Sequence, residues 1–502
     1  MLFNSIEFLL FFPIVLLVYF VLPSRIRYFW LLIASYYFYM CWNPVYILLI
    51  VISTVITYLC GRIVGAFREK SGLTEKQKKR RMKLVMAASF LVNAGLLIYF
   101  KYTNFFIDCL NRVLGTLKME KLTQLDILLP VGISFFTFQA LGYTIDVYRG
   151  EVKAEKNLFK YALFVSFFPQ LVAGPIERSK NLLGQIREEP SRRLWNYQRV
   201  TSGLIIMLWG FFMKLVIADR AAILVDTVFD GYESYQMTGL VLGVVIFTVQ
   251  IYCDFAGYST IATGTARVLG FELMENFNTP FLAGSVADFW RRWHISLGTW
   301  FRDYLYIPLG GSRCGKWKRY RNILITFGVS GLWHGANFTY VIWGLLHGFY
   351  QMAEKELGPI IKKMNDKCHT RTNSFGYRFF KVLVTFVLCE FAWIFFRAES
   401  VHQAVHYICR MFTCRDWWSL FDQSIYQLGL DVTEMHILGV GTAVLFLVDL
   451  LKYRKGQGLA DFLAKQWIVF RWCILLGLLF VCVVFGCYGP GFDSAQFIYF
   501  QF

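Results

Sequence analysis

Residues 323–349 read Ile323-Leu-Ile-Thr-Phe-Gly-Val-Ser-Gly-Leu-Trp-His334-Gly-Ala-Asn-Phe-Thr-Tyr-Val-Ile-Trp-Gly-Leu-Leu-His-Gly-Phe349, an apolar stretch that follows a basic segment from Arg313 to Arg321. This pattern is typical of a membrane helix that starts at a cytoplasmic surface. At about 1.5 Å of helical rise per residue, His334 would lie roughly 20 Å beyond Arg321, deep in a hydrocarbon core about 30 Å thick. An ionisable group at that depth is costly and usually faces a cavity or a partner, so His334 is the first candidate for a functional residue.

The composition of the whole chain agrees with a membrane location. The 502 residues are 57% hydrophobic and 19% aromatic, and only 17% are charged. Such a composition predicts an all-α, polytopic integral membrane protein. The net charge of +18 comes from short loops between apolar segments, which is the positive-inside pattern and argues against a nucleic-acid partner. Twelve cysteines without a CxxC pair are expected to be small hydrophobic residues and not metal ligands.

Loop charges predict the topology. The most basic loop, 68–83, is placed in the cytoplasm, which puts both termini and the acidic loop 219–233 outside. The first apolar segment carries Glu7 and has no cleavage signal, so we expect it to be retained as a span. The expected spans are 6–22, 28–41, 45–65, 84–100, 127–147, 203–218, 237–253, 379–396, 434–451 and 472–488.

Two further apolar segments do not fit as full spans. The segment Tyr161–Ala173 has basic residues on both sides and ends in a Gly-Pro pair, so we expect it to enter the membrane and return. Loop charges also require both ends of 322–352 to lie inside, which predicts a helical hairpin broken near Gly331, Gly335 and Asn337. A single long span through 322–352 remains the alternative.

Five motifs follow one another along the second third of the chain. They are Pro169-Gln170-Leu-Val-Ala-Gly174-Pro175-Ile, Gln250-Ile-Tyr252-Cys-Asp254-Phe-Ala-Gly257-Tyr258-Ser259, Asn276-Phe-Asn278-Thr-Pro280-Phe, Arg292-Trp293-His294-Ile-Ser296-Leu and Leu332-Trp333-His334-Gly335. Together they resemble the membrane-bound O-acyltransferase (MBOAT) family, in particular its bacterial alginate O-acetylation branch. The resemblance covers essentially the whole chain; one departure is Thr260, where the family often has an acidic residue. It implies one MBOAT domain over 1–502, with about ten transmembrane helices plus re-entrant segments and with the core motifs in 169–350.

The resemblance implies that His334 is the catalytic histidine and that His294 is the second polar residue of the centre. Acyl transfer from a thioester to a hydroxyl needs a base with a pKa near neutrality, which histidine supplies. The alternatives are a structural polar contact for His334 and a hydrogen-bonding scaffold role for His294.

Other polar and aromatic residues of the motifs are candidate substrate-binding residues. Asp254 is more readily explained as a structural carboxylate that pairs with Arg291 or Arg292, and Gln170 either shapes the loop that lines a donor tunnel or simply packs. The full candidate set is Gln170, Asp254, Arg291, Arg292, Trp333 and Asn337.

Three other histidines carry weaker signals. His402 and His406 are spaced i, i+4 as metal ligands on one helix face would be, but no third ligand is evident, so we expect no metal site. His347 is expected to be a hydrogen-bonded core residue near Trp343.

The C-terminal tail, 489–502, ends in Gln496-Phe497-Ile498-Tyr499-Phe500-Gln501-Phe502. One interpretation is an aromatic belt at the outer interface. The segment also resembles the aromatic, tyrosine-containing ends of small partner proteins of the teichoic-acid system, which implies that Tyr499 carries the acyl group transiently. A phenol and a thiol have similar pKa values, so an aryl ester would keep much of the transfer potential of a thioester.

The expected function is to pass an acyl group, in the first place acetyl, from a cytoplasmic thioester to a cell-surface polysaccharide across the bacterial plasma membrane. The donor is acetyl-CoA or an acyl carrier protein, and no bound cofactor or metal is expected. The implied partners are an extracytoplasmic acyltransferase of the SGNH type, the polysaccharide and membrane lipids. The alternatives are D-alanyl transfer, acyl transfer to a lipid or protein hydroxyl, and a transporter in which His334 relays protons.

Overall fold

The computed structural model describes residues 1–189 and 194–488, and within these ranges all regular secondary structure is helical. The chain forms two compact units, which we describe separately: residues 1–203 with 262–274, and residues 204–261 with 275–502. The helices α9 (Tyr197–Phe211) and α11 (Met237–Leu269) contribute residues to both units. The expectation of one domain over the whole chain stays a prediction.

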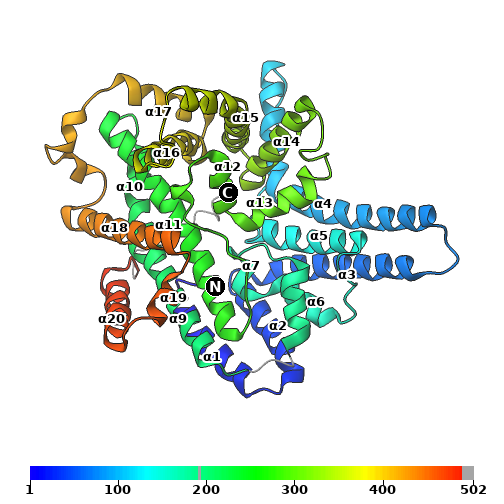
Figure 1. Ribbon diagram of the computed structural model, residues 1–502. Coiled ribbons are helices and arrows are strands. Elements are labelled where there is room, and N and C mark those ends of the chain that lie inside the picture. Colours follow the sequence, from blue (N-terminus) through cyan, green and yellow to red (C-terminus); the bar gives the residue numbers. More distant parts are fainter. Residues whose placement is uncertain (190–193, 489–502) are drawn as a thin grey trace. The chain divides into compact units, whose positions relative to one another are not determined.

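The first unit is built around three long helices that lie side by side, α3, α4 and α5 (Figure 1). Helix α4 begins at Glu75, where Thr74 and Gln77 cap it reciprocally, so the expected basic loop 68–83 is wrong over most of its length: only 70–74 is a loop, and most of the basic residues lie in the first turns of α4. The helices of this unit are α1 (Ile6–Val21), α2 (Ser24–Met40), η1 (Pro44–Tyr46), α3 (Ile47–Glu69), α4 (Glu75–Thr116), α5 (Ile133–Arg149), α6 (Leu158–Ser166), α7 (Phe168–Leu171), η2 (Ser179–Leu183) and α8 (Gly184–Glu188).

The expected span at 127–147 begins later than the sequence predicted. Helix α5 starts at Ile133, because Pro130 disfavours a helical residue before it and Gly132 takes a positive φ of 74°. The segment Tyr161–Ala173 is interrupted at Phe167, whose ψ of 111° separates α6 from α7. It is therefore not a full span, as predicted; its return through a membrane stays a prediction.

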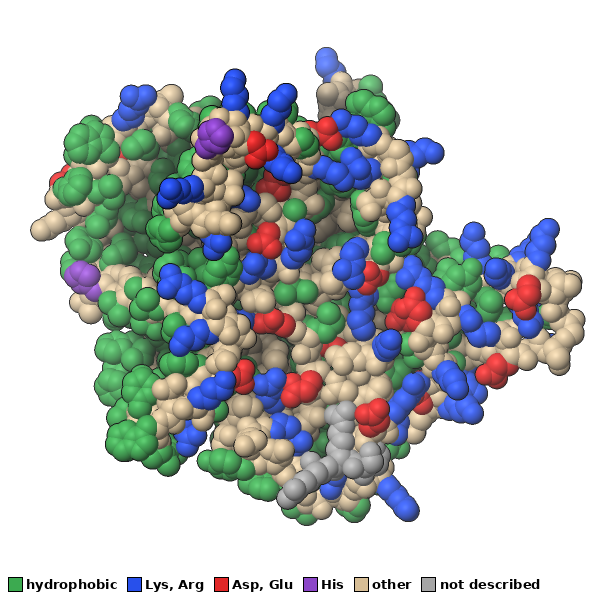
Figure 2. Space-filling view, in the orientation of Figure 1, with side chains coloured by type: hydrophobic (Ala, Val, Ile, Leu, Met, Phe, Trp, Pro, Cys, Tyr) green, Lys and Arg blue, Asp and Glu red, His purple; other side chains and the backbone are tan. Residues whose placement is uncertain are grey.

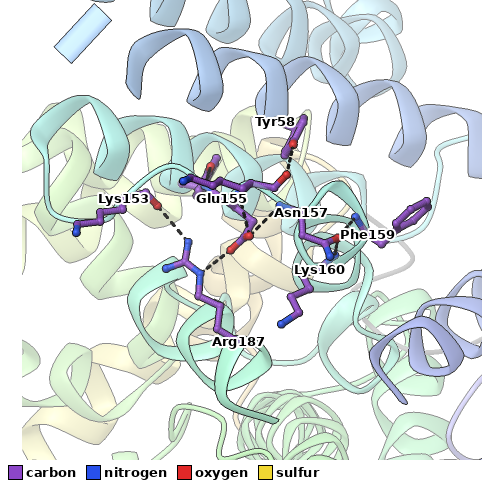
Figure 3. Close-up of polar contacts among 9 residues, drawn as sticks. Tyr58, Lys153, Glu155, Asn157, Phe159, Lys160 and Arg187 are labelled. Atoms are coloured by element: carbon purple, nitrogen blue, oxygen red, sulfur yellow. Dashed lines mark hydrogen bonds and ion pairs between the residues drawn. The ribbon is translucent and has the colours of Figure 1, made fainter. Parts of the chain in front are cut away.

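A buried carboxylate fixes the basic loop that leads into α6 (Figure 3). Glu155 Oε1 accepts hydrogen bonds from the backbone N–H groups of Lys156 and Asn157, both at 2.9 Å, and Arg187 Nε donates to Oε2 at 2.5 Å. Tyr58 of α3 donates to the Lys156 carbonyl at 2.7 Å. The Glu155 carboxylate thus provides hydrogen-bond acceptors for the Arg187 guanidinium and for two backbone N–H groups of the loop.

The second unit carries the remaining helices, of which α14 and α15 are the most closely packed pair. Its helices are η4 (Phe212–Ala218), α10 (Asp219–Asp230), η5 (Pro280–Leu282), α12 (Val286–Arg292), α13 (Ile295–Phe301), η6 (Arg302–Tyr306), α14 (Lys316–His334), α15 (Phe338–Lys367), α16 (Phe375–Arg397), α17 (Val401–Thr413), η7 (Trp417–Leu420), η8 (Ser424–Gln427), α18 (Val432–Lys455), α19 (Leu459–Ala464) and α20 (Ile468–Phe485). The expected acidic loop 219–233 is wrong over most of its length, since α10 occupies it.

The predicted hairpin in 322–352 is confirmed. Helix α14 ends at His334 and α15 begins at Phe338, and the two pack along their lengths. Glycines allow this close approach, because a methyl group added at Gly331 would overlap the Tyr340 carbonyl and one at Gly344 would overlap the Phe327 carbonyl. Gly331 therefore lies opposite Tyr340, and Phe327 opposite Gly344, so α14 and α15 are antiparallel. The alternative of a single long span is wrong.

Seven helical segments within the described residues are long and apolar enough to cross a membrane. They are Pro44–Glu69, Glu75–Thr116, Tyr197–Asp230, Met237–Leu269, Phe375–Arg397, Val432–Lys455 and Ile468–Phe485. The other three expected spans form shorter helices, α1, α2 and α5, of 16, 17 and 17 residues. Apolar side chains cover α20 at the lower left of Figure 2, as expected for a surface that faces lipid. The chain is thus a multi-pass integral membrane protein; the sides of its termini stay predictions.

Candidate active site

His334 is the last residue of α14 and lies at the tip of the hairpin, with 2% of its surface exposed. Its ring centroid is 5.0 Å from that of Trp333, 5.1 Å from that of Trp343 on α15 and 5.5 Å from that of Phe396 on α16. Three helices therefore hold this imidazole in a pocket of aromatic rings, where its orientation is restricted.

His294 occupies the turn between α12 and α13 and is completely buried. Its φ of 44° and ψ of 52° are left-handed values that are uncommon for a residue with a side chain, so the surrounding contacts must hold this conformation. Two backbone hydrogen bonds do so: Ile295 N–H donates to the Asn276 carbonyl at 3.0 Å, and Asn278 N–H donates to the Arg292 carbonyl at 2.9 Å.

The Asn276 side chain determines which ring nitrogen of His294 carries the proton. Asn276 Oδ1 lies 3.2 Å from His294 Nδ1 and also accepts from the hydroxyl of Ser296 at 2.9 Å and from its N–H at 3.3 Å. Because a carbonyl oxygen only accepts, Nδ1 carries the proton and Nε2 is the acceptor of the neutral ring. His294 lies outside the membrane-spanning helices, and burial lowers its pKa to about 3, which keeps the ring neutral at physiological pH.

The structure brings the two predicted histidines together. Their ring centroids are 6.2 Å apart, and Trp333 lies beside both, 5.9 Å from His294. Phe255 of α11 packs edge-on against His294 at 4.7 Å. Residues that are forty positions apart in the sequence thus form one buried centre; their catalytic roles stay predictions.

Asp254 forms its ion pair with a residue other than the predicted arginines. Its Oδ1 lies 2.5 Å from Lys214 Nζ, which also contacts Asp219 Oδ1 at 2.7 Å, and none of the three side chains is more than 4% exposed. The π-helix η4 presents Lys214 to α11 where Gly257 approaches the Gly210 carbonyl closely. The expectation of a structural pair was right and its partner was wrong. Since the next residue is Phe255, this pair fixes the helix that supports His294.

The two adjacent arginines have different surroundings. Arg292 pairs with Asp288 one turn earlier at 3.0 Å and lies over the ring of Tyr453 at 5.3 Å, so its guanidinium already has partners within the protein. Arg291 faces a cavity of about 1700 Å³ that opens among α12, α13, α14, α15 and α16. This cavity is large enough to admit a substrate.

The cavity is basic, and it approaches the histidine pair. Its cationic lining residues are Arg291, Arg302, Arg319, Lys355, Lys362 and Lys381, against the acidic Glu354 and Asp366. Trp290 lines the cavity, its ring centroid is 5.6 Å from that of Trp343, and Trp343 contacts His334. One layer of aromatic rings therefore separates the cavity from His334.

Two of the remaining candidates have local structural roles. Asn337 caps α15 by accepting from Thr339 N–H at 3.2 Å, and its amide donates to the Glu399 carbonyl at 2.7 Å. Gln170, in the first unit, donates to the Phe164 carbonyl at 3.0 Å. Trp333, by contrast, lies within the histidine centre. Sequence reasoning missed Asn276 as a functional residue, although the Asn276-Phe-Asn278 motif contained it.

The weaker histidine signals have mixed outcomes. His347 lies in the core beside Trp343, as predicted, but neither of its ring nitrogens has a hydrogen-bond partner among the described residues, so the expectation of a satisfied side chain was wrong. His406 Nδ1 is 3.2 Å from the hydroxyl of Tyr232. Within residues 1–189 and 194–488, no group of three or more potential ligands is placed to hold a metal ion. Tyr499 lies outside the described residues.

Comparison with known proteins gives a consistent result over most of the chain. Residues 37–396, which include both histidines of the centre, match the model of the membrane-bound O-acyltransferase family. A probable alginate O-acetylase AlgI of Pseudomonas putida is 37% identical over 512 aligned positions that cover 100% of both chains. A peptidoglycan O-acetyltransferase of Helicobacter pylori is 34% identical and covers 81% of this chain and 78% of its own. A teichoic acid D-alanyltransferase of Bacillus subtilis is 26% identical, with 54% of this chain and 69% of its own covered.

Proposed function

Since the chain belongs to the membrane-bound O-acyltransferase family, we propose that it takes an acetyl group from a cytoplasmic thioester and passes it across the membrane for O-acylation of a cell-surface polysaccharide. The observation that carries this proposal is the buried pair of His294 and His334, with ring centroids 6.2 Å apart, one aromatic layer away from a basic cavity.

The pair suits a proton transfer that accompanies acyl transfer. The hydroxyl oxygen of the acceptor attacks the thioester carbonyl carbon, so that a C–O bond forms and the C–S bond breaks. His334 takes the hydroxyl proton as attack begins and returns it to the departing thiolate, which leaves as a thiol. No proton is gained or lost overall. An imidazole that is neutral at the start can accept the hydroxyl proton and then donate it to the thiolate.

His294 positions the acceptor in this scheme. Because Asn276 Oδ1 accepts a hydrogen bond from Nδ1–H, the lone pair of His294 Nε2 can accept a hydrogen bond from a hydroxyl group. A hydroxyl held between the two imidazoles would present its oxygen to the thioester while His334 removes its proton. The surrounding rings exclude water, which would otherwise compete with the hydroxyl for the acyl group.

The basic cavity favours a donor that carries phosphate. Its six cationic side chains suit the phosphates of acetyl-CoA or the phosphate that links the arm of an acyl carrier protein to its serine. The positive-inside distribution of loop charges supports a cytoplasmic location for this face. The reacting thioester would then enter at the rim and reach His334 through the aromatic layer.

On the outer side, Tyr499 would receive the acetyl group and an extracytoplasmic acyltransferase of the SGNH type would transfer it to the polysaccharide. If this relay exists, Tyr499→Phe abolishes surface acetylation while the protein still reaches the membrane. Unchanged surface acetylation in that variant contradicts the relay.

The relatives support the choice of acetyl as the acyl group and of an enzyme as the class of protein. The full-length match is to a probable alginate O-acetylase, whereas the D-alanyltransferase match covers 54% of this chain, which favours acetyl over D-alanyl. Membership of an acyltransferase family sets the transporter interpretation aside. The test is to replace His334 with Ala in cells: surface polysaccharide loses its O-acetyl groups while the membrane content of the protein is unchanged. Retained O-acetylation in that variant would remove the proposal.

A further inference from the structure

Four aromatic side chains between the cavity and His334 carry polar ring nitrogens that lack hydrogen-bond partners among residues 1–189 and 194–488. They are Nε1 of Trp290, Nε1 of Trp343, Nε1 of Trp393 and both nitrogens of His347. Trp343, Trp393 and His347 have no exposed surface at all. Folded proteins leave few buried polar groups unpaired, so several of them in contact with one another require an explanation.

These rings form a continuous path. His347 lies 5.1 Å from Trp290, which lines the cavity, and 5.2 Å from Trp343, as measured between ring centroids. Trp343 in turn lies 5.1 Å from His334. On α15 the cavity residue Tyr350, His347 and Trp343 follow at intervals of three and four residues, so they share one face of that helix. Polar ring nitrogens therefore accompany this path from the cavity to the centre.

The chemistry of these nitrogens defines what would bind there. An indole N–H only donates, whereas a neutral imidazole offers one donor and one acceptor. The complementary ligand presents carbonyl acceptors and an amide N–H along a narrow, largely uncharged chain. The pantetheine arm of a thioester donor has this composition, with two amide groups between a phosphate at one end and the thioester at the other.

We propose that His347, Trp290 and Trp343 bind the amide groups of the donor's pantetheine arm, and that His347 is a donor-binding residue of the acyltransferase. This assignment rests on the proposed function for the direction of entry. In it the cations of the cavity rim hold the phosphate, the ring layer holds the amides, and the thioester arrives at His334. The same arm is present on coenzyme A and on a carrier protein.

The test measures binding separately from turnover. Purified full-length protein carrying His334→Ala is titrated calorimetrically with acetyl-CoA and with acetyl-pantetheine, which lacks the phosphates. Adding His347→Phe keeps a ring of similar shape but removes both nitrogens, and adding Trp343→Phe removes one N–H. Loss of one hydrogen bond raises the dissociation constant about three- to tenfold for both probes.

Two controls make the result specific. Trp317→Phe alters an indole at the surface, 81% exposed, and should leave both dissociation constants unchanged. Arg302→Gln at the cavity rim should weaken acetyl-CoA but not acetyl-pantetheine. An acetylated carrier protein serves as a third probe and identifies the natural acetyl donor. The donor is the carrier protein if this probe binds more tightly than acetyl-CoA, and it is acetyl-CoA otherwise.

The inference and the proposed function can fail independently. Dissociation constants that do not change in His347→Phe and Trp343→Phe would overturn the inference and leave water as the partner of these nitrogens. Weakened binding in those variants, combined with no acetyl transfer by the protein with His334 intact, would support the inference and contradict the function. The melting temperature of each variant, matched to the parent, ensures that a folding defect is not read as a binding defect.

Discussion

The orientation of His294 depends on one side chain, Asn276, and this dependence can be measured. Replacing Asn276 with Ala removes the acceptor of three hydrogen bonds: 3.2 Å to His294 Nδ1, 3.3 Å to Ser296 N–H and 2.9 Å to the Ser296 hydroxyl. A hydrogen bond contributes about 0.5–1.5 kcal/mol, and a buried donor left unpaired costs about 1–3 kcal/mol.

Only the contact with His294 bears directly on catalysis. Its loss frees the ring to change tautomer and to rotate, so kcat should fall by roughly tenfold to a hundredfold, the equivalent of about 1.4–3 kcal/mol. The KM for the acetyl donor should change little, because Asn276 does not line the cavity. The assay is release of free thiol from acetyl-CoA by the purified protein, with an oligosaccharide acceptor, over a range of donor concentrations and pH.

Asn276→Asp is the matched variant, because a carboxylate still accepts from His294 Nδ1–H. Its negative charge favours the protonated imidazolium and raises the pKa of His294 from the low value that burial gives it. Since catalysis needs the neutral ring, activity should fall on the acid side at a higher pH than in the parent and recover as the pH rises. A kcat unchanged in Asn276→Ala, or a pH profile unchanged in Asn276→Asp, would show that His294 is not held in this way.

Two other substitutions test the buried Lys214 ion pairs and the close packing of α14 and α15. Lys214→Met leaves two buried carboxylates without their cation and should destabilise the protein by about 3–5 kcal/mol, seen as a lower melting temperature. A variant in which both carboxylates are also changed to amides should recover much of this loss. Equal melting temperatures for Lys214→Met and the parent would contradict the buried pairing. Gly331→Ala forces α14 away from the Tyr340 carbonyl and should displace His334, so that acetyl transfer is lost. The control is Gly477→Ala on α20, where the added methyl group meets open space and activity should not change. An active Gly331→Ala protein would show that the hairpin tolerates the displacement.

The sequence predicted the hairpin because its two signals are local. Basic residues predict that 322–352 begins and ends on the same side, and glycines mark where two helices approach and where the chain bends. The pairing of His294 with His334 followed from motifs whose order resembles a family. Composition and spacing alone would have left His294 as one polar residue among several near a charged interface.

The missed features depend on three-dimensional register. Lys214 reaches Asp254 because η4 is a π-helix and two glycines bring the helices together, and nothing local in the sequence distinguishes Lys214 from a lysine at a membrane surface. Asp219, which takes part in the same pairing, is the first residue of α10, where the sequence predicted a loop. The unpaired nitrogens of His347 follow from side-chain packing among three helices, which hydrophobic patterning does not specify.

The most direct test is a single-turnover measurement on the purified protein. Acetyl-CoA labelled in the acetyl group is mixed with excess protein in lipid nanodiscs, and thiol release and label transfer to the first hydroxyl acceptor, which is Tyr499 of the protein itself in the proposed relay, are followed together. With His334 intact, thiol release and label transfer should proceed at the same rate, and His334→Ala should abolish both while donor binding persists. Equal rates of transfer in the parent and in His334→Ala would contradict the assignment of His334 as the base.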